Sequence, residues 1–154
     1  MNEKLLNEMY KDPYFSMAPP KSTGREYFTL PWLDAHLKNH PALTPQDVQC
    51  TLLHLTAKSI ADSILSHTLS NPQVILCGGG RLNPALVYAL ETYLMPLKVS
   101  VTEDFGIDGD FLEAGLCAWV AYQTMNGLAS NVPAVTGSSG PRILGGVFTG
   151  KIPL

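Results

Sequence analysis

The spacing of apolar residues along the chain first indicates a long helix. Apolar side chains recur three and four positions apart over residues 44–69, which is the period of one helix face. The segment begins with Thr44-Pro45, a pair typical of a helix start, and is followed by Ser70-Asn71-Pro72, which is typical of a helix end. We therefore expect one helix over residues 44–69.

Short apolar runs and further helical patterns follow this helix. Residues 73–77 are a short continuous apolar run that predicts a buried strand, and residues 99–102 predict a second short strand. Helical spacing returns at Asn83-Pro84 and again over residues 109–127, where five side chains are expected to point inward: Leu112, Leu116, Trp119, Val120 and Met125. Strands that alternate with helices predict an α/β fold with parallel pairing.

The two ends of the chain carry shorter patterns. Residues 1–10 and 27–37 predict short helices, separated by a proline-containing loop over 11–25. Residues 143–148 predict a last short strand. Residues 1–154 show no internal repeat, and this length is that of one domain or lobe, so we expect a single lobe.

Composition and charge narrow the class of protein. Hydrophobic residues make up 45% and charged residues 15%, which suits a lobe that buries part of its surface against another lobe or subunit. The net charge is −3, without a basic stripe, so we expect no nucleic-acid partner. The sequence contains no run of about 18 apolar residues, so we expect no membrane span. The polar first residues exclude a signal peptide, and the three distant cysteines, Cys50, Cys77 and Cys117, indicate reduced, mostly buried thiols in the cytoplasm.

A glycine run after the first predicted strand is the strongest local feature. Gly78, Gly79 and Gly80 have no Cβ to keep a ligand away from the backbone, and the helix that starts near Asn83 directs N–H groups toward the same place. This arrangement favours a nucleotide site, and the alternative is a tight turn that needs a positive φ. A dinucleotide site, with Glu103 or Asp104 as the ribose-binding acid, is a further alternative.

Acidic residues cluster before and within the last predicted long helix. Asp108 and Asp110 flank its start, where carboxylates usually cap N–H groups. Glu113 lies one turn into the helix among apolar neighbours, so its carboxylate faces either solvent or a cleft.

Two other groups of residues suit a ligand by residue type. The loop over residues 21–25 carries two cations, two hydroxyls and a glycine, which fit an anion or an interface, or a loop pinned by its own hydrogen bonds. Two pairs with a spacing of four would suit zinc, although exposed histidines and a buried cysteine are the alternative: His36 with His40, and Cys50 with His54.

Taken in order, short motifs along nearly the whole chain resemble the anhydro-N-acetylmuramic acid kinase family. They include Asp12-Pro13-Tyr14-Phe15, Pro19-Pro20-Lys21-Ser22-Thr23-Gly24-Arg25-Glu26, Cys77-Gly78-Gly79-Gly80 with Asn83-Pro84, Gly106-Ile107-Asp108-Gly109-Asp110 with Glu113-Ala114, and Val135-Thr136-Gly137. The resemblance covers the C-terminal half of such an enzyme.

The resemblance implies a function and a set of site residues. It implies the C-terminal lobe of an actin, hexokinase and Hsp70-like (ribonuclease H-like) kinase, acting on 1,6-anhydro-N-acetylmuramic acid with ATP and Mg²⁺ in cytoplasmic peptidoglycan recycling, as a homodimer. By the same resemblance Gly78, Gly79, Gly80 and Asn83 contact the nucleotide, and Glu113 contacts the sugar.

These 154 residues also depart from the family pattern. The Gly-Thr-Ser-x-Asp-Gly phosphate loop and the Asp-Thr-Gly-Pro-Gly-Asn run with the general base do not occur in them. Because phosphoryl transfer depends on positioning and charge stabilisation, we expect no turnover without a separate N-terminal half. The alternative is a non-catalytic remnant that keeps a nucleotide-binding or dimerisation surface.

Overall fold

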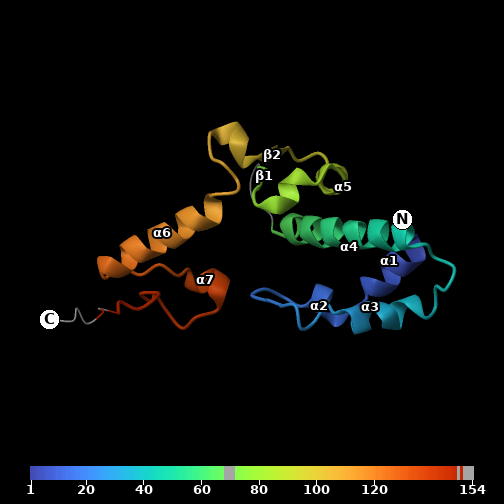
Figure 1. Cartoon of the computed structure of the whole chain (residues 1–154), viewed down its shortest axis with the longest axis horizontal. Helices are drawn as coiled ribbons and strands as arrows, with labels where there is room; N and C mark the ends of the chain where they lie inside the picture. The colour runs from blue at the N-terminus through green and yellow to red at the C-terminus, as the bar shows by residue number, and fades with distance from the viewer. Residues whose placement is uncertain (68–71, 149, 151–154) are drawn as a thin grey trace. The chain divides into compact units, whose positions relative to one another are not determined.

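The computed structural model describes residues 1–67, 72–148 and 150, in two compact units, Met1–Gly109 and Asp110–Leu154 (Figure 1). The first unit is a mixed helix and strand layer built on a long helix. Its elements are α1 (Glu3–Met9), α2 (Pro13–Ser16), α3 (Leu30–Leu37), α4 (Pro45–Leu65), β1 (Val74–Leu76), η1 (Gly79–Leu82), α5 (Pro84–Leu94), β2 (Val99–Val101) and η2 (Thr102–Phe105). The predicted alternation of helices and strands is confirmed.

The long helix α4 starts where the sequence predicts and ends earlier. Thr44 is its N-cap, with the hydroxyl oxygen 3.2 Å from the Asp47 backbone nitrogen, and Pro45 is its first residue. The predicted end at residue 69 is wrong, because α4 ends at Leu65. The His67 ring contacts the Ser63 carbonyl at 2.7 Å, while the His67 N–H donates to Ile64 in a tighter turn. Residues 70 and 71 of the predicted stop signal lie outside the described residues.

Two hydrophobic cores lie against α4, one involving the strands and α5 and the other the N-terminal helices (Figure 1). We call the first the sheet-side core, and its buried members are Ala57, Ala61, Val74, Ala89, Leu90 and Leu94. The second, the N-terminal core, buries Leu5, Leu6, Met9 and Leu55. Alanines on α4 and α5 let these two helices approach closely, so α4 fixes the position of β1 and of the glycine run that follows it.

The strands β1 and β2 form a two-stranded parallel sheet in the described part of the chain. Their register pairs Val74 with Val99 and Leu76 with Val101. Parallel pairing was predicted and is confirmed. The expectation of a fully buried first strand is wrong, because Ile75 in the middle of β1 is 44% exposed.

The N-terminal helices are joined by an aromatic cluster around Asp12. The indole N–H of Trp32 donates to one carboxylate oxygen of Asp12 at 2.9 Å, and the hydroxyl of Tyr27 donates to the other at 2.9 Å. Phe28 packs its ring against Trp32 edge to face, with centroids 5.1 Å apart. This cluster ties α2 and its following loop to α3.

The second unit contains α6 (Leu112–Met125) and α7 (Pro133–Thr136). The prediction that one face of α6 points inward is wrong within this unit, since Leu116, Trp119 and Met125 are all exposed. No strand forms over 143–148 either. The described residues of this unit include no strand that could pair with this segment, and the Leu144 carbonyl accepts a hydrogen bond from the Thr124 hydroxyl on α6 instead.

Other expectations about single residues are also corrected. Cys77 and Cys117 are exposed and Cys50 is only partly buried, because Cys77 follows a strand with an open face and Cys117 lies on α6, whose residues are mostly exposed. The N-cap position of α6 is taken by Phe111 rather than by Asp108 or Asp110. Among the described residues, no helix combines the length and apolar character that crossing a bilayer requires.

Candidate functional site

The glycine run forms a tight turn between β1 and α5. Gly78 has φ 71° and ψ −179°, a backbone conformation that is nearly restricted to glycine. The turn continues as η1, in which the Arg81 N–H donates to the Gly78 carbonyl at 3.2 Å and the Asn83 N–H donates to Gly80 at 3.1 Å. The sequence predicts a tight turn with a positive φ as the alternative to a nucleotide site, and Gly78 does have a positive φ.

The same turn leaves open space above its backbone. A Cβ added at Gly78 or Gly79 would meet nothing within 4 Å, and one at Gly80 would be 3.5 Å from Leu86. The run also follows the carboxyl end of a parallel strand, where ligands bind in open α/β sheets. The backbone of the turn is therefore accessible at Gly78 and Gly79, with no neighbouring atom within 4 Å of where a Cβ would stand.

Asn83 is the N-cap of α5, as the sequence pair Asn83-Pro84 predicted for the start of this helix. Its carboxamide oxygen accepts hydrogen bonds from the backbone N–H groups of Ala85 and Leu86, at 3.1 and 3.3 Å, and so caps α5. The carboxamide nitrogen is the part of the side chain that the cap does not use. A contact of Asn83 with a ligand would therefore come from this nitrogen as a donor.

An arginine within the turn, which the sequence reasoning did not single out, fixes the turn to the end of β2. The Arg81 side chain is 6% exposed, with Nη2 at 2.6 Å and Nε at 2.7 Å from a Glu103 carboxylate oxygen. Its Nη1 donates to the Gly78 carbonyl at 3.0 Å. The same oxygen of Glu103 accepts the Gly109 N–H at 3.2 Å. Glu103 is thus an ion-pair partner of Arg81.

This ion pair shapes both the electrostatics and the packing around it. The hydrogen bond from Arg81, helped by the Gly109 N–H, lowers the pKa of Glu103 from 4.5 to about 2. Asp108 lies 3.8 Å from Arg81 Nη2 and adds a second carboxylate. A Cβ on Gly109 would lie 2.5 Å from Arg81 Nε, so the absence of a side chain there makes room for the guanidinium.

Glu113 lies in the second unit, in the first turn of α6, and is exposed. Its predicted contact with a sugar stays a prediction. The four predicted nucleotide residues, by contrast, are brought together in one turn of the first unit.

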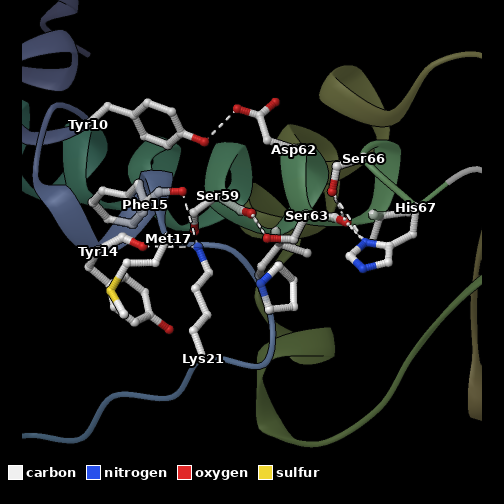
Figure 2. Close-up of a pocket in the computed structure, with 13 residues that line it drawn as sticks. Tyr10, Tyr14, Phe15, Met17, Lys21, Ser59, Asp62, Ser63, Ser66 and His67 are labelled. Atoms are coloured by element: carbon white, nitrogen blue, oxygen red, sulfur yellow. Dashed lines mark hydrogen bonds between the residues drawn. The ribbon is translucent and has the colours of Figure 1, made fainter. Parts of the chain in front are cut away.

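The loop over residues 21–25 contributes to a cavity of about 600 Å³ beside α4 (Figure 2). Lys21 Nζ donates to the carbonyls of Tyr14 and Phe15 at 3.0 and 3.1 Å and lies over the Tyr14 ring. The hydroxyls of Ser59 and Ser63 donate to backbone carbonyls of α4. These polar groups are hydrogen-bonded to backbone carbonyls of the protein itself. At Lys21 this favours the alternative in which the loop over residues 21–25 is held by its own hydrogen bonds.

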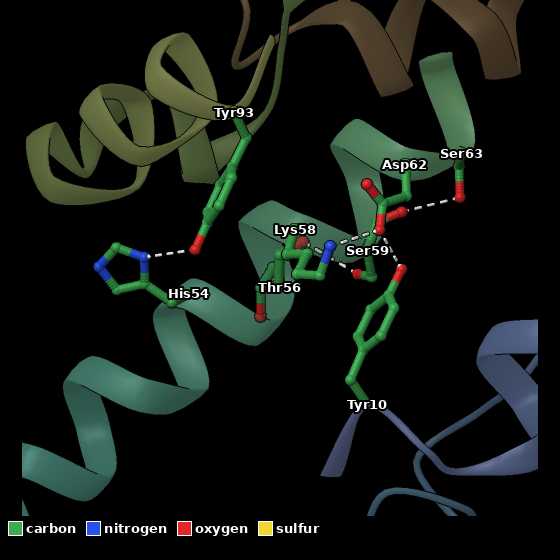
Figure 3. A network of polar contacts seen from close by, with 8 residues as sticks. All are labelled: Tyr10, His54, Thr56, Lys58, Ser59, Asp62, Ser63 and Tyr93. Carbon is green, nitrogen blue, oxygen red and sulfur yellow. Dashed lines mark hydrogen bonds and ion pairs between the residues drawn. The ribbon is translucent and has the colours of Figure 1, made fainter. Parts of the chain in front are cut away.

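A polar network connects α4 to its neighbours (Figure 3). The Tyr10 hydroxyl and Lys58 Nζ both donate to one oxygen of Asp62, at 2.6 and 2.8 Å. Burial and the bond to Asp62 raise the pKa of Tyr10. His54 Nδ1 lies 3.0 Å from the Tyr93 hydroxyl on α5. These contacts join helices, so the network has a structural role.

The histidines of the sequence-based zinc alternative have protein partners. His40 Nε2 is 2.8 Å from Glu8 and its side chain is 7% exposed, so the expectation of exposed histidines is wrong there. His54 pairs with Tyr93 as above. In residues 1–67, 72–148 and 150, no three metal-ligating side chains come close enough to hold an ion.

Comparison with known proteins decides the family. The family model for anhydro-N-acetylmuramic acid kinase matches residues 1–150. This chain belongs to the anhydro-N-acetylmuramic acid kinase family. A kinase of that name from Pseudomonas putida KT2440 is 46% identical over 144 residues, which are 94% of this chain. The chain spans 40% of the length of that relative.

Proposed function

We propose that this chain is the C-terminal lobe, of the actin, hexokinase and Hsp70 type, of an ATP-dependent anhydro-N-acetylmuramic acid kinase. The enzyme would open 1,6-anhydro-N-acetylmuramic acid with water and phosphorylate it to N-acetylmuramic acid 6-phosphate, in cytoplasmic peptidoglycan recycling. The family match over residues 1–150 carries this proposal. By resemblance, the assembled enzyme is a homodimer.

Within that enzyme, we assign the glycine run to the adenosine of ATP. ATP, when bound, supplies the phosphoryl group. The open backbone at Gly78 and Gly79 lets a nucleoside approach without a Cβ in the way. Asn83 offers its carboxamide nitrogen as a donor beside the α5 N-terminus, and the buried Arg81–Glu103 pair holds the turn in place.

Glu113 is the residue that we assign to the sugar. An exposed carboxylate in the first turn of α6 can accept hydrogen bonds from sugar hydroxyls and help to orient a water molecule.

The proposal requires complementation by the rest of the enzyme. The phosphate loop and the general base of the family do not occur in these 154 residues, so we expect no turnover by this chain alone. The test is to co-express this chain with the region of the P. putida kinase that it does not match, and to assay ATP-dependent phosphorylation of the anhydro sugar. Product from the co-purified pair only is the expected result. No product from a folded, co-purified pair would favour a non-catalytic remnant.

A glycine-to-alanine pair tests the nucleotide assignment. Gly79→Ala has room for its Cβ in the unliganded protein and does not have a positive φ, so it should leave stability unchanged. If a nucleoside lies against this backbone, Gly79→Ala should raise the KM for ATP about tenfold or more in the complemented enzyme, with the KM for the sugar little changed. Gly140→Ala, whose Cβ would be 3.4 Å from the end of the Arg142 side chain, is the matched control. An unchanged KM for ATP in Gly79→Ala would contradict the assignment.

A further inference from the structure

We propose that Arg81 is a positioning residue of the nucleotide site, which acts by fixing the peptide between Gly78 and Gly79 and does not itself touch the nucleotide. This inference rests on the proposed function in one respect, because it takes the glycine run to be the place where the adenosine lies. The evidence is the set of hydrogen bonds around Gly78 and the burial of the Arg81 side chain.

The Gly78 carbonyl accepts two hydrogen bonds from the same residue. The backbone N–H of Arg81 donates to it at 3.2 Å, and Nη1 of the Arg81 side chain donates to it at 3.0 Å. The peptide between Gly78 and Gly79 is trans, so its N–H points in the direction opposite to its carbonyl. The two donors therefore also fix the direction of the Gly79 N–H, which points away from the guanidinium.

A run of three glycines needs such a constraint if it is to keep one conformation. Glycine adopts positive and negative φ about equally readily and loses more conformational freedom on ordering than any other residue. Gly78, with φ 71°, is the member of the run that uses this freedom. A nucleotide that binds a mobile run has to order it, and the entropy lost in doing so weakens binding. A run that is held before binding avoids this loss.

The Arg81 side chain is itself held by a second segment of the chain. It is 6% exposed, and one oxygen of Glu103 accepts hydrogen bonds from its Nη2 and Nε at 2.6 and 2.7 Å. The same oxygen accepts the Gly109 N–H at 3.2 Å, and the Gly109 carbonyl accepts the Gly78 N–H at 3.3 Å. These contacts form a closed ring that holds both the N–H and the carbonyl of Gly78.

The surroundings of the guanidinium do not suit a direct contact with phosphate. Each of its three nitrogens already has a partner within the chain. A phosphate at this place would have to displace Glu103, and it would lie beside a second carboxylate, that of Asp108, which is 3.8 Å from Nη2. Like charges repel, so these two carboxylates oppose an anionic ligand. The geometry therefore assigns Arg81 to the backbone of the run.

Three variants separate this role from the loss of a charge. Arg81→Met removes the guanidinium and keeps a long side chain. Arg81→Lys keeps the charge, but its ammonium cannot reproduce the planar fork that reaches both Gly78 and Glu103. Lys98→Met removes a positive charge from an exposed position of the same unit and is the matched control. Each variant is co-purified with the complementary region of the P. putida kinase, and calorimetry measures the Kd for ADP and for adenosine.

We expect Arg81→Met to raise the Kd for ADP and for adenosine by the same factor, about tenfold or more, because the change lies in the backbone against the nucleoside. Arg81→Lys should show most of this loss and Lys98→Met none. In the complemented enzyme the KM for ATP should rise by the same factor, while kcat and the KM for the sugar change by less than about twofold. A general defect in folding would lower kcat as well.

Glu103→Gln tests whether the two side chains act together. It should raise the Kd for ADP in part, and the double variant with Arg81→Met should bind no more weakly than Arg81→Met alone. Hydrogen exchange adds a readout without activity. In the unliganded chain, the Gly78 amide should exchange about tenfold faster in Arg81→Met than in the wild type. If Arg81→Met does not fold, Arg81→Lys and Glu103→Gln decide by the same criteria.

Several results would overturn this proposal. An unchanged Kd for ADP or unchanged exchange of the Gly78 amide in Arg81→Met would do so, as would a wild-type pair that binds no ADP. Weaker ADP binding with unchanged adenosine binding would make Arg81 a direct phosphate contact instead. The proposed function fails separately. A pair whose ADP binding depends on Arg81 but which makes no product would reject the kinase assignment and keep the positioning role.

Discussion

Asn83 combines a helix cap with a proposed ligand contact, and substitution can separate the two. Its carboxamide oxygen accepts two backbone N–H groups at the start of α5. Asn83→Ala removes both hydrogen bonds, and the loss of such a cap typically costs about 1 kcal/mol, with a range of roughly 0.5–2 kcal/mol. Asn83→Asp keeps an acceptor oxygen, caps about equally well and adds a negative charge that suits a helix N-terminus. We therefore expect a stability loss in the first variant only.

Urea unfolding followed by far-UV circular dichroism measures this difference. With a urea dependence of about 2 kcal/mol per molar, 1 kcal/mol lowers the unfolding midpoint by about 0.5 M. Asn7→Ala, at an exposed asparagine of α1, is the control and should change stability by less than about 0.5 kcal/mol. An Asn83→Asp protein as unstable as Asn83→Ala would refute the capping argument. If Asn83→Asp is stable but binds ATP more weakly in the complemented enzyme, the amide nitrogen is the ligand contact.

Three further predictions concern the core, the glycine turn and the ion pair. Leu94→Ala empties a fully buried position of the sheet-side core and should cost about 2–5 kcal/mol in urea unfolding; a loss below about 1 kcal/mol would contradict its burial. Gly78→Ala should cost about 1–3 kcal/mol through its positive φ alone, measured against a neutral Gly79→Ala, and equal stabilities would argue against this backbone conformation. Because the folded-state pKa of Glu103 is depressed to about 2, its stabilising effect is present above pH 4.5 and is lost as the pH falls toward 2. The stability advantage of the wild type over Glu103→Gln should shrink over that range in acid unfolding, and a constant difference would argue against the pairing with Arg81.

The sequence predicted the elements whose signals are local. Thr44-Pro45 and Asn83-Pro84 mark helix starts because a cap needs only the next few residues to form its hydrogen bonds. Parallel pairing also followed from the sequence, since α5 returns the chain between the two strands. The site residues of the glycine run share one turn for the same local reason.

The errors arose where structure depends on distant or missing partners. The apolar side chains of α6 predict that other residues pack against this helix, but the sequence pattern does not say whether those residues belong to the same unit. Within its own unit, Trp119 is 47% exposed. Residues 143–148 have strand composition, yet a strand needs a neighbour to pair with. The contact between Arg81 and Glu103 joins positions 22 residues apart, and no local pattern indicates it. Arg81 was therefore missed although it lies inside the strongest motif.

The placement of the two tryptophans gives each compact unit its own optical reporter. The chain has 2 tryptophans, Trp32 in the first unit and Trp119 in the second. The indole of Trp32 is hydrogen-bonded to a carboxylate and contacts the rings of Phe28 and His36 edge to face, whereas Trp119 is nearly half exposed to solvent. Replacing Trp119 by phenylalanine would leave emission from the N-terminal helices alone, and replacing Trp32 would leave emission from α6 alone. Fluorescence can then follow the melting of each unit separately, and a change in Trp119 emission would report any new molecule that covers α6.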